Sequence, residues 1–187
     1  MTVSTRNSLR AALDEIRHSS HATAGFTTAL AGAAAAALGQ ACVGISLQTG
    51  AGSHPVHARL GAIVTGLEDW ADDDAGALAT LIAFREQGRE EAGWEALMAG
   101  PVAIADLACE AAELLLGFRP SVVDHVRDDM EFAVGLLNAA ARSALLIVES
   151  NLRQWRASAL HARYGPETER LSRRIEAIQP VAHVAWR

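Results

Sequence analysis

Two aspartates stand among apolar neighbours at helical spacing, and carboxylates in such places can do acid–base chemistry. Asp74 falls in line with Leu67 and Leu81. Asp129 falls in line with Leu136. A carboxylate on an apolar stripe is paired with a cation, shifted in pKa, or placed near the end of the buried zone. Both residues are therefore candidate catalytic groups, with an arginine ion pair at a helix end as the alternative.

The neighbouring acids fall on other helical faces, which we expect to be solvated. In the second cluster that face carries Asp128, Glu131, Asn138 and Arg142. We therefore predict that Asp129 is more buried than Asp128. In the first cluster we predict that Asp74 is more buried than Asp72 or Asp73.

The composition restricts lysine and metal chemistry. All 16 basic residues are arginines, which excludes a Schiff-base lysine, a lysine base and a phosphate-loop lysine. Two histidine pairs have ligand-like spacing: His18 with His21, and His54 with His57. Neither pair is accompanied by a third ligand of defined spacing. We therefore expect no metal and no other required cofactor.

The charge of the chain restricts its partners. A net charge of −6 argues against nucleic acid, because phosphate contacts need a basic surface. An anionic small molecule has candidate ligands near the expected helix ends: Arg59, Arg85, Arg89 and Arg119. Solvated arginine is the alternative for each of them.

No charged residue occurs between Arg17 and Arg59, and alanine and glycine dominate residues 29–47. A helix that is apolar on every side must be buried on every side, in lipid or inside a bundle. A membrane span needs about 20 strongly apolar residues, usually with basic flanks. Here Leu and Ile are sparse, and Gln40 and Ser46 interrupt the stretch. We therefore predict the central helix of a soluble bundle and no membrane contact.

The remaining composition predicts one domain over residues 1–187. Half of the residues are hydrophobic but only 5% are aromatic, and Ala, Leu and Val, which carry the apolar share, are typical of a helical core. The first ten residues lack the apolar core of a signal peptide, which predicts a cytoplasmic protein. Cys42 and Cys109 have no metal or redox spacing, and we expect them to be buried free thiols.

Turn-forming residues divide the chain into helical stretches, without β-strand alternation. The expected helices cover about residues 4–18, 26–47, 56–87, 89–116, 121–162 and 167–178. Gly100-Pro101 is expected to kink or start the fourth of them. The stretch from Ser121, a candidate N-cap, would be about 60 Å long and would outrun a compact domain of this size. We therefore expect an all-α bundle of long helices and a homodimer that uses the helix from Ser121 onward.

The order of these segments resembles the cyclodeaminase/cyclohydrolase family. This family comprises the C-terminal domain of formiminotransferase-cyclodeaminase and the related bacterial methenyltetrahydrofolate cyclohydrolases. The resemblance covers about residues 20–156. Its elements are the Ala/Gly helix at 29–38, the acidic segment 67–77, the helix 100–114, and Asp129 followed by an Ala-rich stretch and Asn151-Leu152.

The resemblance implies a helical homodimer that binds a tetrahydrofolate one-carbon adduct in a cleft, with Asp129 in the active site. A carboxylate suits this chemistry, because opening or closing the five-membered ring needs proton transfer at a nitrogen and stabilisation of an amidinium-like cation. We expect an enzyme, a lyase or hydrolase, with Asp129 and Asp74 as its catalytic residues. The residues expected to bind its small-molecule substrate are Gly25, Phe26, His21 and Arg127.

The chain departs from the family pattern at the glycine loop, which reads Ser20-His-Ala-Thr-Ala-Gly25-Phe26. One glycine stays, and a phenylalanine stands where the family has serine; a triple glycine would let a ligand approach the backbone. Arg127 or Asp128 replaces the serine before the aspartate, and the lysines expected after the Ala-rich helix are absent. We therefore predict a cleft near Gly25, Phe26, Asp74 and Asp129 that accepts a small organic ligand but binds tetrahydrofolate poorly.

Three functions are compatible with this pattern. The first is a divergent folate cyclodeaminase or cyclohydrolase. The second is an enzyme of the same scaffold, a biosynthetic cyclase or lyase, that acts on another cyclisable nitrogenous substrate. The third is a non-catalytic helical dimer.

Overall fold

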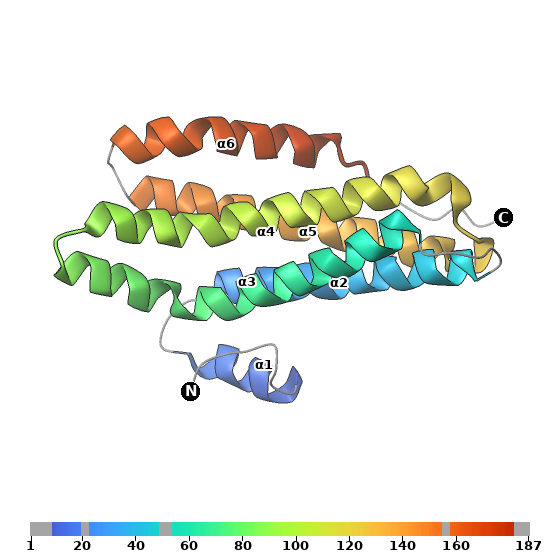
Figure 1. The fold of residues 1–187 in the computed structure, drawn as a ribbon, viewed down its shortest axis with the longest axis horizontal. Helices are drawn as coiled ribbons and strands as arrows, with labels where there is room; N and C mark the ends of the chain where they lie inside the picture. The colour runs from blue at the N-terminus through green and yellow to red at the C-terminus, as the bar shows by residue number, and fades with distance from the viewer. Residues whose placement is uncertain (1–8, 20–22, 49–53, 155–157, 182–187) are drawn as a thin grey trace.

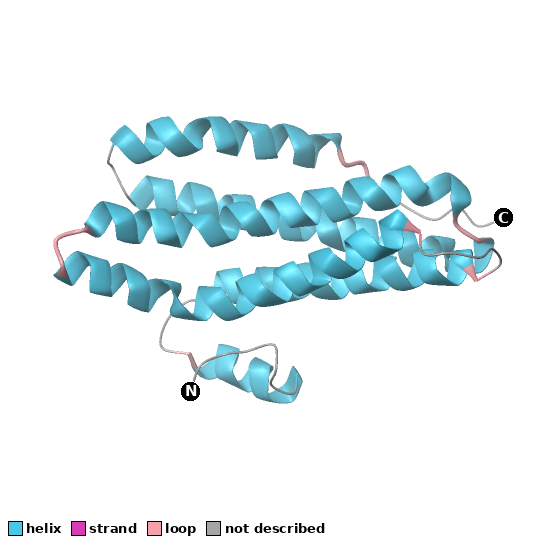
Figure 2. Ribbon diagram, viewed as in Figure 1, coloured by secondary structure: helices cyan, strands magenta, loops and turns pink. Residues whose placement is uncertain are grey.

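The computed structural model describes residues 9–19, 23–48, 54–154 and 158–181, and these contain helices and no strand (Figures 1 and 2). The all-α prediction is therefore confirmed. The helices are α1 (Leu9–His18), α2 (Ala24–Leu47), α3 (Pro55–Glu86), α4 (Glu90–Phe118), α5 (Arg127–Gln154) and α6 (Ser158–Ala177). Two short 3-10 turns, Arg119–Ser121 and Asp124–Val126, lie between α4 and α5.

Helices α2 to α5 form an antiparallel four-helix bundle. Each helix packs against the next, and α5 closes the ring against α2. This places α3 diagonally across the bundle from α5. Helix α6 lies along α4 and α5, and α1 lies on the opposite side of the bundle (Figure 1).

Small residues on α2 let the neighbouring helices approach closely. A Cβ atom added to Gly39 would come within 2.5 Å of the Leu115 side chain of α4. One added to Gly32 would lie 3.4 Å from Leu67 of α3 and 3.6 Å from Ala140 of α5. Larger residues at these positions would therefore push the bundle apart. The prediction that this segment is a bundle helix is confirmed for its inner side.

No described part of the chain covers the outer side of α2. The exposed residues on it are Ala24, Thr27, Ala31, Ala34, Ala37 and Ala41. By length and composition, two of the described helical stretches, Ala24–Leu47 and Asp124–Gln154, pass the criteria for a membrane span. Of their most apolar windows, 44% and 50% are buried inside the bundle. Both helices therefore have one packed side and one apolar outer side.

The last part of the chain differs from the predicted single helix over 121–162. Helix α5 begins at Arg127, after the two 3-10 turns, and ends at Gln154. A separate helix, α6, then folds back and runs through Gly165 and Pro166. The 28 residues of α5 correspond to about 42 Å. The expected 60 Å helix is wrong, so helix length gives no argument for a dimer. The prediction that the fourth helix could start at Gly100-Pro101 is also wrong, because α4 begins at Glu90 and continues through Pro101.

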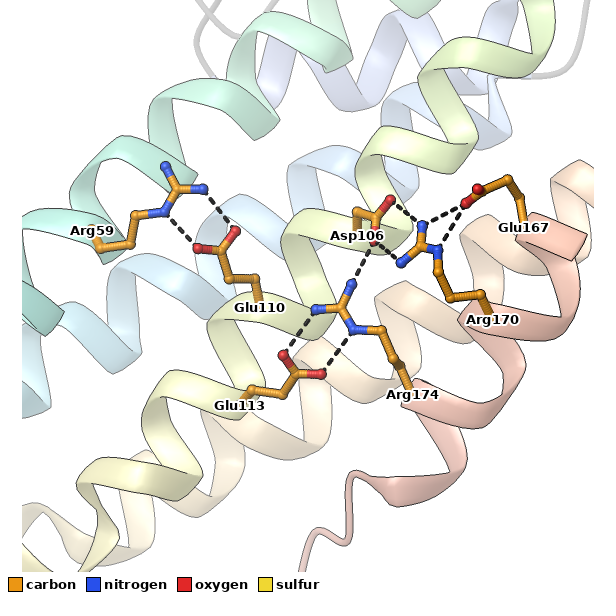
Figure 3. Close-up of polar contacts among 7 residues, drawn as sticks. All are labelled: Arg59, Asp106, Glu110, Glu113, Glu167, Arg170 and Arg174. Carbon is orange, nitrogen blue, oxygen red and sulfur yellow. Dashed lines mark hydrogen bonds and ion pairs between the residues drawn. The ribbon is translucent and has the colours of Figure 1, made fainter. Parts of the chain in front are cut away.

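Helix α6 is held on the bundle by ion pairs with α4 (Figure 3). Arg170 binds both carboxylate oxygens of Asp106 at 2.7 Å. Arg174 binds both carboxylate oxygens of Glu113 at 2.9 Å and also contacts Asp106. Bidentate arginine–carboxylate pairs fix both distance and orientation. On the α5 side, the buried Asn138 amide donates to the Ile175 carbonyl at 3.0 Å.

Candidate functional site

The first candidate site lies at the start of α2, where Asp74 of α3 meets Gly25. The backbone N–H of Phe26 donates a hydrogen bond to the Asp74 carboxylate at 2.8 Å. A Cβ atom added to Gly25 would come within 2.0 Å of the same carboxylate. Glycine is therefore required for this close approach, and Asp74 is held against the first turn of α2.

Asp74 supplies the acceptor that the helix start lacks. Thr23 occupies the N-cap position of α2 but makes no side-chain capping bond. The first turn of a helix leaves its N–H groups unsatisfied and carries a partial positive charge, so a carboxylate is favoured there. Asp74 is half-buried, as is Asp72, whereas Asp73 is exposed. The prediction that Asp74 is more buried than Asp73 is thus confirmed. The predicted difference in burial between Asp74 and Asp72 is not resolved.

Phe26 presents only its backbone to this site. Its ring is fully buried at 0% exposure and belongs to the hydrophobic core. Its side chain therefore fills space inside the bundle, and it does not line an open cavity. His21, predicted to bind substrate beside it, lies outside the described residues.

Asp129 lies in the first turn of α5 and is exposed, as is Asp128. Burial of Asp129 is therefore not found, and its predicted difference from Asp128 is not resolved, since both side chains are exposed. The face that was expected to be solvated carries two buried polar residues, Glu131 at 8% and Asn138 at 6% exposure. Arg119 binds Glu131 with two hydrogen bonds of 2.7 Å, and α6 covers Asn138. These partners make burial of both side chains possible.

Asp129 lies at the other end of α2 from Gly25. Two effects raise the pKa of the Cys42 thiol: first its burial, and second the negative charge of the nearby Asp129 carboxylate. Cys42 lies 17 positions after Gly25, which is about 25 Å along α2. The predicted cleft that joins Gly25, Phe26, Asp74 and Asp129 therefore does not form within one chain. Arg127 is beside Asp129 and binds Asp124 at 2.8 Å.

Two open cavities lie at the two ends of the bundle. One, of about 440 Å³, lies between residues 23–28 at the start of α2 and residues 143–147 of α5. Its polar lining consists of the hydroxyl residues Thr23, Thr27, Thr28 and Ser143. The other, of about 390 Å³, lies where α3 begins and α4 ends, beside His54 and Phe118. Only the first cavity shares the start of α2 with Asp74.

The arginines predicted to recognise an anion are already engaged. Carboxylates pair with three of them: Arg59 with Glu110, Arg85 with Glu90, and Arg119 with Glu131. The fourth, Arg89, lies over the Phe84 ring at 4.9 Å. The hydrogen bonds from Arg59 hold the pKa of Glu110 below its ordinary value. Arg59 and Arg119 therefore serve the bundle, whereas the Arg85–Glu90 pair is 3.8 Å long and largely exposed.

A comparison with protein families gives a match over residues 8–170 to the model described as formiminotransferase-cyclodeaminase. The chain belongs to this family.

The fold agrees with that assignment. Superposition on the crystal structure of formiminotetrahydrofolate cyclodeaminase from Thermotoga maritima gives a TM-score of 0.78. The alignment covers 92% of each chain at 18% sequence identity. Among curated proteins, no sequence matches the chain. The family model extends the resemblance found in the sequence into α1 and into the first part of α6.

Within this family fold, the described residues contain no group of three or more histidine, cysteine, aspartate or glutamate side chains that could hold a metal ion. His54 has a structural role, since its ring nitrogen accepts a hydrogen bond from the Val56 N–H at 3.3 Å and caps α3. Cys42 and Cys109 are free and buried, as predicted.

The hydrogen bond between Asp74 and Phe26 was missed by reasoning from the sequence. The two residues are 48 positions apart, and only their shared place in the resemblance connected them. Three residues could have indicated this contact. Thr23 is a residue type that starts helices, Gly25 has no Cβ atom, and Asp74 is a carboxylate on an apolar stripe. Asp74 therefore stays a candidate site residue with a demonstrated structural role.

Proposed function

We propose that the chain is a cyclodeaminase-like enzyme that acts on a C–N bond of a small cyclisable substrate, with Asp129 and Asp74 as its catalytic carboxylates. The observation that carries the proposal is the family match over residues 8–170. The similar fold of the Thermotoga maritima cyclodeaminase supports it. Both aspartates come from the segments that carry the resemblance, and each lies in or against the first turn of a helix.

The chemistry needs a group that transfers a proton and a group that stabilises a cation. Ring closure onto an amidine carbon protonates the departing nitrogen, and ring opening by water reverses the direction of proton transfer. Asp129 is exposed and, among the described residues, is not held by an arginine, so its carboxylate is available for proton transfer. Asp74 is held at a helix start by the hydrogen bond from the Phe26 N–H, and a carboxylate fixed in this way is suited to stabilise a cation.

The substrate is proposed to differ from the glutamate-bearing folates. The chain has no lysine, and the four arginines near helix ends are paired with carboxylates or stacked on a ring. A polyanionic glutamate tail would find few cations on such a surface. A tetrahydrofolate one-carbon adduct stays the first substrate to test, because the similar solved structure is named for one.

We propose that the enzyme works as a cytoplasmic homodimer without a metal or other cofactor. The similar solved enzyme and the half-buried state of α2 and α5 support a bundle in solution. A non-catalytic helical dimer is the second candidate, and it is favoured by the structural roles of Asp74 and Arg119.

The test is an activity assay with paired substitutions at adjacent positions. Purified protein is incubated with formimino- and methenyl-tetrahydrofolate, and ring closure or opening is followed by absorbance. Asp129→Asn should lower kcat by about 10²–10⁴-fold, the usual contribution of a general acid or base. Asp128→Asn is the matched control, because both side chains are exposed in the same helical turn. It should retain the wild-type rate.

Two results would count against the proposal. Equal rates for the Asp129→Asn and Asp128→Asn proteins would remove Asp129 from the mechanism. A wild-type protein that is inactive on both folates and on small amidine substrates would favour the non-catalytic dimer. Full activity on methenyltetrahydrofolate would confirm the enzyme and contradict the proposed weak folate binding.

A further inference from the structure

The connection from α4 to α5 holds the one buried charged side chain among the described residues, Glu131, at 8% exposure. The other buried polar side chains there are neutral: Thr28, Ser46 and Asn138. Arg119, in the 3-10 turn directly after α4, donates to both carboxylate oxygens of Glu131 at 2.7 Å. The pair therefore ties the end of α4 to α5 across 12 positions of the chain.

The same connection is also tied to α2. The Val123 N–H donates a hydrogen bond to the Ser46 hydroxyl at 3.2 Å, and this hydroxyl donates to the Cys42 carbonyl at 2.8 Å. Val122 and Val126, before and after Val123, are buried in the core. Polar contacts to two helices and two apolar anchors therefore fix the chain just before α5.

Asp129 lies in the part of α5 that these contacts hold. It belongs to the first turn, where N–H groups lack partners within the helix and helices fray. Glu131 follows two positions later, at the start of the second turn. Met130 between them is fully buried, but apolar contacts are non-directional, whereas a bidentate pair fixes both distance and orientation. The Arg119–Glu131 pair therefore adds a fixed geometry that the packing of Met130 does not supply.

A contribution to stability is a poor explanation of this pair. Removing two charges from water is costly, and apolar residues of similar volume often give a protein of equal or greater stability. The Arg119 side chain is 36% exposed, so solvent also weakens the attraction between the two charges. The fixed geometry at the start of α5 is the property that an apolar pair would lack.

We infer that Arg119 and Glu131 are positioning residues, which hold the start of α5 so that the Asp129 carboxylate has a fixed place for proton transfer. The inference rests on the proposed function for the role of Asp129. A misplacement of about 1 Å at a reacting group can cost about 100-fold in rate, because the geometry of the reacting atoms is part of the barrier. Arg119 and Glu131 act through Asp129 and need no contact with the substrate.

Two variants remove the pair in different ways, and both are assayed with formimino- and methenyl-tetrahydrofolate. Glu131→Gln keeps the shape of the side chain and removes its charge. It should lower kcat about 10-fold and leave KM within about two-fold of wild type, because the contribution of Asp129 is made in the transition state. The double variant Arg119→Met/Glu131→Leu leaves no unpaired buried charge, so its urea midpoint should be no lower than that of the wild type. It should show the same loss of kcat.

The matched control is Glu110→Gln. Arg59 binds Glu110 with the same bidentate geometry, at 2.6 and 2.7 Å. This pair joins α3 to α4, and α3 lies diagonally across the bundle from α5. The control should therefore retain the wild-type kcat and KM.

A nitroxide label follows the start of α5 without any substrate. On Asp128→Cys, whose side chain is exposed beside Asp129, the electron paramagnetic resonance line shape reports the mobility of the first turn. The native thiols are buried at 2% and 0% exposure and give little background. The label should become more mobile in both variants of the Arg119–Glu131 pair and should stay unchanged in Glu110→Gln.

The outcomes separate the positioning role from the proposed function. Wild-type kcat in the double variant would overturn the inference even with a more mobile label, and so would an equal loss of kcat in Glu110→Gln. An unchanged label in both pair variants would overturn it whatever their kcat. A wild-type protein that is inactive on both folates and on small amidines would overturn the proposed function, and the label would then decide by itself whether the pair fixes the start of α5.

Discussion

Two outer faces of the bundle differ in chemistry. The face between α4 and α5 is covered by α6, which is held by arginine–carboxylate pairs around Asp106 (Figure 3). The face between α2 and α5 carries exposed alanine, leucine and phenylalanine side chains, and its α2 side has no charge. The first cover comes from the same chain. No described part of the chain covers the second face, and its apolar composition is typical of an interface that stays closed.

The difference teaches how α5 can be apolar on two sides. One side packs inside the bundle, where Met130, Val134 and Leu137 are fully buried. The other side repeats the same residue types at Phe132 and Leu136 but meets solvent in the single chain. Ion pairs with α4 therefore hold α6 on the first face, whereas the second face offers mainly apolar contacts.

The largest effect is expected at Leu136, on the exposed apolar side of α5. Leu136→Asp places a charge where the two copies of the proposed homodimer would bury it, and it should weaken the dimer by more than about 100-fold. Light scattering at micromolar concentration should then report a monomer. Ile82→Asp is the matched control, since Ile82 is 51% exposed on α3, across the bundle from α5. A dimer that survives Leu136→Asp would break the comparison between the two faces.

A second large effect is expected where the apolar face ends at the start of α2. Gly25→Ala forces a Cβ atom against the Asp74 carboxylate and should lower the free energy of unfolding by about 2–3 kcal/mol. Gly76→Ala makes no contact within 4 Å and should raise it by up to about 1 kcal/mol through helix propensity. Urea denaturation measures both. Similar stabilities for the two variants would show that Asp74 is not held against α2.

A smaller effect is expected on the charged face. Asp106→Ala removes the acceptor shared by Arg170 and Arg174 and should cost about 1–2 kcal/mol, since a third of the carboxylate is exposed and solvent screens the pairs. Glu169→Ala is the control, because its pair with Arg173 is 3.8 Å long and largely exposed. Its unfolding free energy should stay within about 0.5 kcal/mol of wild type. An equal loss in both variants would contradict the role given to Asp106.

The smallest effect concerns Cys109, which lies beneath the charged face. Burial raises the pKa of its thiol to about 11, so the folded protein keeps the proton longer than the unfolded chain does. The resulting contribution to stability is full below about pH 9 and is lost as the pH rises toward 11. The free energy of unfolding should therefore fall over this range, and Cys109→Ala should remove that part of the fall. If the free energy of unfolding of Cys109→Ala falls between pH 9 and pH 11 as much as that of the wild type, the role given to the Cys109 thiol is contradicted.

Much of the fold could be predicted because turn formers mark its boundaries. The turn around His54 and Pro55 and the break near Gly88 were expected within a few positions of where α3 begins and ends. The alanine-rich segment was expected to pack closely, and Gly39 against Leu115 shows that it does. Local sequence carries these features, since they depend on residues a few positions apart.

The site could be predicted less well, and α5 shows why. Periodicity separates an apolar face from a polar one, but α5 has an inner and an outer apolar face. Periodicity therefore predicts that Leu136 is a core residue and that Asn138 is solvated, whereas Leu136 is exposed and Asn138 is buried. The buried state of Asn138 depends on α6, whose start after Gln154 has no glycine or proline to mark it. Contacts that come from another element, or from another chain, leave no local signal.

The distance between two spin labels tests most directly whether the apolar face is covered by a second copy. A label on Gln154→Cys lies at the exposed end of α5, 15 positions from the midpoint between Phe132 and Leu146. Antiparallel α5 helices would bring Asp128 near the partner's Arg153, and a parallel pair would bring each charge near its own copy. In a homodimer with antiparallel α5 helices the two labels should be about 40–45 Å apart, given a rise of 1.5 Å per residue. A pulsed electron paramagnetic resonance experiment on the purified protein measures this distance. A single population near 40–45 Å would support the account. A distance of about 10–20 Å, as in a parallel pair of helices, or no dipolar coupling at all would contradict it.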